Sequence, residues 1–249
     1  MFEAAVNGEH HESLDAHSFD TIVGTSGMSR RNPAVDEGDL VSGTISFSRG
    51  DKHNPLGMYA VKGLSVSIEQ GRLDTGKHGM DFTQIMMDVH WHTETFQKRR
   101  LFPMTLDFRF TASASAGDLP VQRFGSIDTR FLAWMPFGAF KSIGNRPIEG
   151  EHHAALFMEH NFRTVPFEII GLRWLAKKNV GIIAHCAAGR TWITNERVKI
   201  LTFHPFYYDR TISEGGLSLN GVFGIGRIDF SKCFDTDDYS IGFSMARLF

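Results

Sequence analysis

Segments that alternate apolar and polar residues are the feature that most limits how this chain can fold. The clearest of them runs from Met104 to Ser115. Successive residues of a β-strand point to opposite faces, so an alternating segment has one apolar and one polar face. The polar face of this segment carries the charged pair Asp107 and Arg109. The apolar face carries Leu106, Phe108, Phe110, Ala112 and Ala114.

Several strand-like segments exceed the modal strand of about 5–6 residues and match the roughly 9–11 residues that cross a bilayer with tilt. Turns that contain Gly, Asp or Asn lie between them, and helical periodicity is almost absent. We therefore expect an all-β chain with about nine or ten antiparallel strands. The long segments are Phe82 to His92, Met104 to Ala116, His153 to Arg163, Val180 to Ile193 and Leu217 to Ser231.

Composition excludes some classes of function. The chain has 249 residues, of which 42% are hydrophobic and 22% are charged. No stretch approaches the roughly 18 apolar residues that a membrane-spanning helix needs, which excludes a helical membrane protein. The formal net charge of -2 and the lack of a basic stripe argue against a nucleic-acid partner.

The last ten residues, Ser240 to Phe249, form an alternating segment that ends on an aromatic residue. This pattern suggests the last strand of an outer-membrane β-barrel, whose strands show one face to lipid and the other to a lumen. An edge strand of a soluble β-sandwich is the alternative. In the barrel interpretation Arg247 shares the lipid face and must lie near the interface. The residues expected to form a carboxy-terminal insertion signal are Phe243, Met245 and Phe249.

The amino terminus, Met1 to Asp20, is acidic and contains histidines, with neither a positive stretch nor an apolar core. It is therefore not a secretory signal peptide. An exported protein needs such a signal, so we expect Met1 to be an internal methionine of a longer protein. We divide the chain into an amino-terminal segment or partial strand, residues 1–37, and a barrel portion, residues 38–249.

Four sequence segments carry a resemblance to a known family. A Gly117-Asp118-Leu119-Pro120 turn leads into a long aromatic loop, and a strand containing A-L-F-M-E-H-N-F-R follows it. Val180 to Trp192 ends in Ala-Gly-Arg-x-Trp, Glu214 to Phe230 contains Arg-Ile-Asp, and the terminal I-G-F-S-M-A-R-L-F closes the pattern. In this order the segments resemble the barrel strands of the bacterial surface antigen family, the BamA-like outer-membrane β-barrels, in their Bacteroidota-type members. Glu214 to Phe230 is similar to the penultimate strand of that family.

The resemblance implies the fold, place and partners of the chain. It implies the carboxy-terminal part of an antiparallel transmembrane β-barrel that has sixteen strands when complete. It also implies a non-catalytic assembly, translocation or transport scaffold in the bacterial outer membrane, without a cofactor. The expected partners are outer-membrane lipid and the barrel-assembly machinery. Where the family has Arg-Gly-aromatic in its long loop, this chain reads Asp128-Thr129-Arg130-Phe131, without the glycine.

A charged residue on a loop that enters a barrel lumen needs a partner of opposite charge. For Arg130 the candidates on polar strand faces are Glu159, Asp229 and Glu214, and we favour Glu159 or Asp229. Arg227 lies two residues before Asp229 and shares its face, so it joins the predicted lumen contact. Solvated charges on a polar wall are the alternative interpretation.

The histidines support a rival hypothesis from a different class. His90 and His92 share a strand face with Asp88 and Glu94, a His-x-His spacing that places two imidazoles on one metal ion. With a third ligand this site would make the chain a soluble or periplasmic metal-dependent enzyme. A chain with 12 histidines, however, contains such pairs by chance.

Three remaining features are interpreted as structural. Cys186 and Cys233 are expected to be small residues on strand walls, with a bridge between them left open. Gly221 to Gly226 is expected to lie within a strand and to ease its curvature or allow close packing, because no strand-to-helix turn surrounds it. Arg173 to Lys178 reads as a short loop or a membrane-edge segment with basic anchors.

Overall fold

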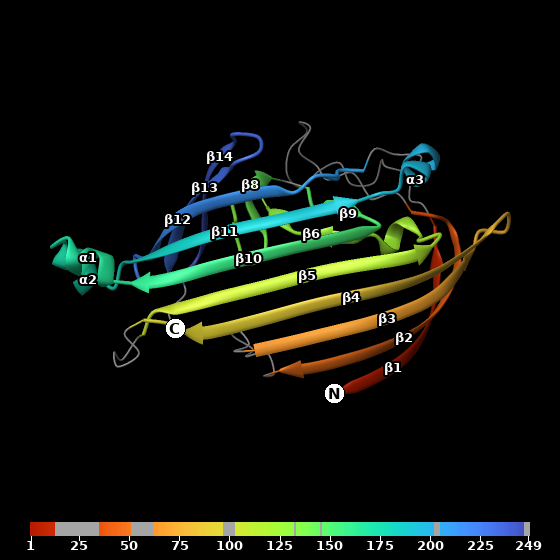
Figure 1. The fold of residues 1–249 in the computed structure, drawn as a ribbon, viewed down its shortest axis with the longest axis horizontal. Coiled ribbons are helices and arrows are strands. Elements are labelled where there is room, and N and C mark those ends of the chain that lie inside the picture. The colour runs from red at the N-terminus through yellow and green to blue at the C-terminus, as the bar shows by residue number, and fades with distance from the viewer. Residues whose placement is uncertain are drawn as a thin grey trace.

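The computed structural model describes residues 1–12, 35–50, 62–96, 103–131, 133–144, 146–201 and 205–246. Ten strands form one antiparallel sheet in the order β1-β2-β3-β4-β5-β10-β11-β12-β13-β14. Each strand therefore pairs with its neighbour in the chain, except where four short strands intervene between β5 and β10. Figure 1 shows the sheet curving around this intervening segment. The prediction of a mostly β, antiparallel chain is confirmed.

The strands of the sheet are long. They are β1 (Phe2–His11), β2 (Gly38–Gly50), β3 (Lys62–Asp74), β4 (Gly79–Glu94), β5 (Thr105–Gly117), β10 (His152–Arg163), β11 (Gly181–Trp192), β12 (Ile212–Val222), β13 (Gly226–Cys233) and β14 (Tyr239–Met245). The intervening segment contains η2 (Val121–Arg123), β6 (Gly125–Ile127), β7 (Thr129–Arg130), β8 (Phe140–Gly144) and β9 (Ile148–Gly150). We call residues 118–151 the inner segment.

Three short helices complete the described structure: α1 (Val165–Ile169), α2 (Arg173–Lys177) and α3 (Asn195–Ile200). The α2 helix occupies the place where the sequence predicted a loop or membrane-edge segment. Within the described ranges, no helix is long and apolar enough to span a membrane.

The two faces of the sheet differ in chemistry. The face that contacts the inner segment, here called the inner face, carries Asp107 and Glu159 among many buried polar residues. The opposite, outer face exposes large apolar side chains along most strands. They include Val6, Val41, Ile45, Ile68, Ile85, Trp91, Leu217, Phe230, Ile241 and Phe243. The alternation predicted for Met104 to Ser115 therefore places Asp107 and Arg109 toward the interior.

The main apolar core lies between the sheet and the inner segment rather than between two sheets. Its inner-segment members are Ile127, Phe140, Ile143 and Ile148, which pack on small or aromatic residues of the strands. Phe140 and Phe157 meet edge to face, with ring centroids 5.6 Å apart. The strand members of this core are Ala155, Phe157, Ala187 and Ile212.

The structure corrects one predicted strand. The single strand expected from Leu217 to Ser231 is a hairpin of β12 and β13, which turns at residues 223–225. Gly224 has a φ of +87°, and glycine adopts this left-handed conformation without steric cost. The glycine-rich run therefore makes a turn instead of easing the curvature of a strand. At the amino terminus, Phe2–His11 is a full strand that pairs with β2 from Phe2↔Phe47 to His11↔Gly38.

Candidate functional site

The inner segment is a long connection between neighbouring strands that packs across the inner face of the described sheet. Its β8 strand contacts β12, β13 and β14, while β6 contacts β10 and β11 and β9 contacts β11. Backbone hydrogen bonds extend it to the edge of the sheet, where Phe243 N donates to Ala133 O and Met135 N donates to Phe243 O. The segment thus touches the last five strands, and its polar contacts define the candidate site.

Four buried charges connect the inner segment to the sheet. Lys141 Nζ lies 3.3 Å from Glu159 Oε1 and 3.1 Å from Asp229 Oδ1. Arg227 donates from both terminal nitrogens to Glu159, at 2.8 and 2.9 Å, and its Nη2 lies 2.7 Å from Asp229 Oδ1. None of the four side chains is more than 4% exposed. We call Lys141, Glu159, Arg227 and Asp229 the charge cluster; its two positive and two negative charges balance.

The residues of the charge cluster that belong to the sheet come from separate strands. Glu159 is on β10, whereas Arg227 and Asp229 are on β13, three strands further along the sheet. The intervening residues on the same side include His185, which pairs with both Glu159 and Gly216. A Cβ on Gly216 would lie 2.6 Å from His185 Nε2 and 1.9 Å from Phe230 O, so only glycine leaves room there. Gly216 therefore permits the close packing on which the cluster depends.

Hydroxyl groups add hydrogen bonds to Asp229 and Arg227, while the buried Arg227 Nε has no hydrogen-bond partner. Ser218 Oγ donates to Asp229 Oδ1 at 2.7 Å and accepts from Arg227 Nη2 at 2.9 Å. Ser244 Oγ donates to the other oxygen of Asp229. A buried charge is tolerated only when it is paired and hydrogen-bonded, and Asp229 meets both conditions.

A third buried acid, Glu214 on β12, binds the backbone of the inner segment. Its carboxylate accepts hydrogen bonds from Lys141 N at 2.8 Å and Ser142 N at 2.7 Å, and from the Ser142 hydroxyl. These bonds satisfy two backbone donors of β8 that would otherwise be buried without a partner. Glu214 therefore holds β8 in place, and β8 contributes the Lys141 side chain to the charge cluster.

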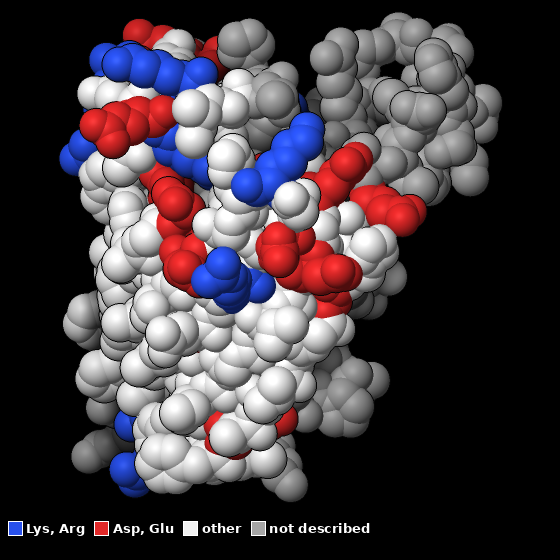
Figure 2. Space-filling model, turned by 90° about the vertical axis from the view of Figure 1, so that its right-hand side faces the viewer, with Lys and Arg blue, Asp and Glu red and all other residues white. Residues whose placement is uncertain are grey.

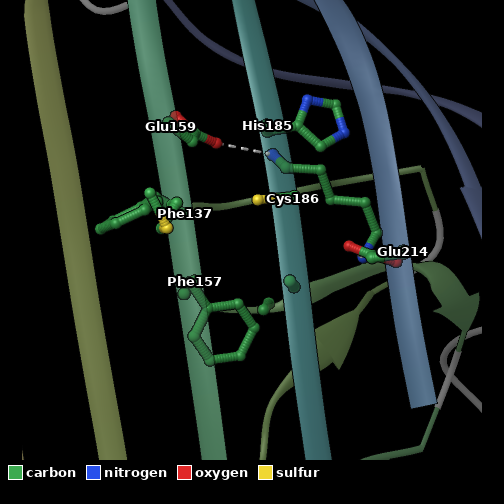
Figure 3. Close-up of a pocket in the computed structure, with 11 residues that line it drawn as sticks. Phe137, Phe157, Glu159, His185, Cys186 and Glu214 are labelled. Atoms are coloured by element: carbon green, nitrogen blue, oxygen red, sulfur yellow. Dashed lines mark hydrogen bonds and ion pairs between the residues drawn. The ribbon is translucent and has the colours of Figure 1, made fainter.

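Figure 3 shows Glu159, His185 and Glu214 beside three successive strands, together with Phe137 of the inner segment. The dashed line joins Glu159 to the Lys141 ammonium. The cavity beside these groups has a volume of about 10 Å³. That is room for about one water molecule. The geometry therefore suits a contact that fixes the inner segment to the sheet. It leaves no space there for an organic ligand.

A second set of contacts anchors the beginning of the inner segment to the opposite half of the sheet. Arg123 on η2 lies 2.6 Å from Glu9 of β1 and 3.1 Å from Glu69 of β3. Its backbone oxygen accepts a hydrogen bond from Gln84 Nε2 at 2.9 Å. Burial disfavours the charged guanidinium, but the hydrogen bonds and charges of the two acids outweigh burial and raise the pKa of Arg123. The inner segment is thus fixed at both halves of the sheet.

Replacing Arg123 with Met is expected to lower the free energy of unfolding by about 2 kcal/mol, because hydrogen bonds to charged groups are worth roughly 1.5–3 kcal/mol. Urea unfolding followed by tryptophan fluorescence measures this loss. The matched control is Arg72→Met. Arg72 is exposed and lies 3.6 Å from the exposed Asp81, so its loss should change stability by less than about 1 kcal/mol. Equal effects of the two substitutions would show that Arg123 is not an anchor.

The structure brings together three of the four residues predicted for the lumen contact, Glu159, Arg227 and Asp229. The inner segment contributes Lys141 as the cation that contacts these residues. The sequence predicted Arg130 for this position. Arg130 lies on β7 beside Gly144, and its buried Nε has no hydrogen-bond partner. The difference arises because β8, and not β7, crosses strands β12 to β14. A lysine inside the apolar run Ala139-Phe140-Lys141-Ser142-Ile143 was the available sequence signal.

The histidines of the rival hypothesis lie on β4 and contact acids separately. His90 Nε2 is 2.8 Å from Asp88 Oδ1, and His92 Nδ1 is 2.8 Å from Asp107 Oδ1. In the part of the chain that the structure describes, no three His, Cys, Asp or Glu side chains are arranged to hold a metal ion.

The predicted insertion signal is only partly within the described residues. Phe243 and Met245 are exposed on the outer face of β14. Phe249 and Arg247 lie outside the described residues. Cys186 and Cys233 are free thiols on strands, one exposed and one buried.

No family model matches the chain, and none of the curated proteins matches it either. Function must therefore be inferred from the geometry and chemistry of the chain itself.

Proposed function

We propose that the ten-stranded sheet is part of the wall of a bacterial outer-membrane β-barrel similar to the bacterial surface antigen family. In this proposal the chain is a non-catalytic scaffold for the assembly, translocation or transport of other molecules. The inner segment lies in the lumen, and the outer face of the sheet contacts lipid. The barrel-assembly machinery inserts the protein into the membrane.

The observation that carries the proposal is the reversal of the usual burial pattern. Charged residues of the charge cluster are buried on the inner face, whereas large apolar residues are exposed on the outer face. Soluble monomers rarely expose contiguous apolar patches larger than a few hundred Å². A barrel wall needs this pattern, because one face meets hydrocarbon and the other a polar interior.

The lengths of the strands and the distribution of charge agree with this proposal. Strands β2 to β5 have 13 to 16 residues, more than the roughly 9–11 that cross the hydrocarbon. Figure 2 shows charged side chains of both signs gathered in the upper half of one face, with few in the lower half. An edge cannot remain unpaired within a bilayer, so β1 and β14 must be joined directly or through further strands.

Heat-modifiable gel mobility tests the proposal. The chain, folded in detergent micelles or phosphatidylcholine vesicles, should migrate differently in unheated and boiled samples, because a closed barrel resists unfolding by the gel detergent. It should also remain with the membrane pellet after alkaline extraction. A protein that is soluble and folded without detergent would overturn the proposal. Stoichiometric zinc in such a soluble protein would favour the rival metal site at His90 and His92.

Deleting Phe249 should lower insertion into the outer membrane and leave secretion to the periplasm intact, because a terminal aromatic residue is the proposed signal for the assembly machinery. Cell fractionation with heat-modifiable mobility measures both quantities. The control is Phe234→Ala, a change of an exposed aromatic residue in the β13–β14 turn. Unchanged insertion after loss of Phe249 would contradict the proposed signal.

A further inference from the structure

Two neighbouring turns at one end of the sheet expose a group of large apolar side chains. Residues 164–180 connect β10 to β11 and contain α1 and α2, and residues 223–225 connect β12 to β13. The turns adjoin, since a Cβ on Gly221 would lie 2.5 Å from Asn179 O. Figure 1 shows α1 and α2 projecting beyond this end of the sheet. We call the exposed set the apolar rim: Ile169, Ile170, Leu172, Trp174, Phe223 and Ile225.

All six side chains of the apolar rim are exposed. Phe223 is 100% exposed and Ile169 is 79% exposed. The same segment also has a buried side, where Val165 and Phe167 pack inward. The two turns are therefore docked on the sheet, and their outward residues lack apolar cover among the residues that the structure describes.

The charges beside the apolar rim are almost all positive. Arg173, Lys177 and Lys178 are exposed on and after α2, and Lys178 Nζ lies 5.9 Å from the centroid of the Trp174 ring. The single acid in residues 164–180 is Glu168, which accepts a hydrogen bond from Thr164 Oγ1 at 2.6 Å. Exposed tryptophan and aliphatic residues beside a basic group are the composition of segments that lie in a lipid headgroup region.

We propose that the apolar rim and its three basic residues form a binding surface for anionic phospholipid headgroups at one membrane interface. The rim is continuous with the apolar outer face through the strands that it joins, so lipid would cover both surfaces together. This inference rests on the proposed barrel and adds a specific lipid class and a position. Trp174 would lie at headgroup depth, and Arg173, Lys177 and Lys178 would contact lipid phosphates.

The lengths of the connections between strands indicate that the apolar rim lies at the periplasmic leaflet of the outer membrane. The longest connections, residues 12–37, 118–151 and 193–211, join strands whose connected ends are at the opposite end of the sheet. In outer-membrane barrels the longer loops are extracellular and the short turns periplasmic. The apolar rim therefore faces the periplasm, where the leaflet consists of phospholipids.

Fluorescence quenching by brominated lipids tests this surface in the full chain reconstituted into vesicles. Subtracting the signal of Trp174→Phe from that of the unchanged chain isolates the emission of Trp174. Competition between brominated phosphatidylglycerol and phosphatidylcholine then gives the relative affinity for the anionic lipid. We expect Trp174 to be quenched and to show a severalfold preference for phosphatidylglycerol, since each Lys or Arg near an anionic surface contributes favourably.

Replacing Arg173, Lys177 and Lys178 together with Gln should abolish the preference and leave Trp174 quenched. The matched control removes two exposed cations at the other end of the sheet, Arg72→Gln with Lys77→Gln, and should leave the preference unchanged. Heat-modifiable mobility is recorded for every variant. Absence of heat-modifiable mobility in the unchanged chain would refute the proposed barrel. A folded, inserted chain whose Trp174 is unquenched, or quenched without preference, overturns the lipid surface alone.

Discussion

Replacing Lys141 with Met is expected to lower the free energy of unfolding by about 3–5 kcal/mol, the usual cost of removing one partner from a buried ion pair. The substitution leaves Glu159 and Asp229 with a single cation, Arg227, inside a region where none of these side chains is more than 2% exposed. Urea unfolding in detergent micelles, followed by tryptophan fluorescence and heat-modifiable mobility, measures the change.

Two variants separate the charge of Lys141 from its packing. Combining Lys141→Met with Asp229→Asn restores charge balance, because Arg227 and Glu159 remain as a bidentate pair, and should recover part of the lost stability. Arg130→Met tests the residue that the sequence favoured for this contact. We expect Arg130→Met to lower the free energy of unfolding by less than Lys141→Met does. An equal or larger decrease would show that Arg130 is the main inward cation.

Replacing Gly216 with Ala is expected to cost about 3 kcal/mol, at the upper end of the range for overpacking a close-packed site. The added Cβ would lie 1.9 Å from Phe230 O, a backbone atom that cannot move without shifting β13. Because β13 carries Arg227 and Asp229, the charge cluster should be disturbed as well. Urea midpoints and the fraction of heat-modifiable protein measure this effect.

The matched control for Gly216 is Gly43→Ala on β2. A Cβ at Gly43 would have nothing within 4 Å, and the position is on the outer face, so the expected change is within about 0.5 kcal/mol. If the two substitutions had similar effects, close packing between His185 and the backbone of β13 would not be the reason for a glycine at position 216.

Most of the sheet was predictable from local patterns. Period-two alternation assigned Asp107 and Arg109 to one face of β5, and Glu159, Arg227 and Asp229 to polar faces, because side-chain direction in a strand depends only on residue parity. The hairpin of β12 and β13 was not predicted, because glycines and apolar residues are mixed in Gly221 to Gly226 and the sequence there resembles a strand. The backbone conformation of Gly224 was the decisive information, and sequence alternation does not report it.

The identity of the inward cation was not predictable by the same means. The inner segment has little alternation, and its path depends on contacts with strands that follow it in the chain. Glu214, for example, reaches back to the backbone of Lys141 and Ser142. Such long-range hydrogen bonds select β8 over β7 to cross the inner face, and no local pattern around Arg130 or Lys141 encodes that choice.

The sequence by itself determined the long alternating strands and which of their residues share a face, because these properties follow from the geometry of an extended chain. The tertiary structure alone decided which charges meet. Four side chains from three distant segments of the sequence form one neutral, buried cluster only after the register of β10 to β13 and the path of the inner segment are established. Burial without pairing would cost several kcal/mol for each charge, so the fold that pairs them is the one in which Lys141 points inward.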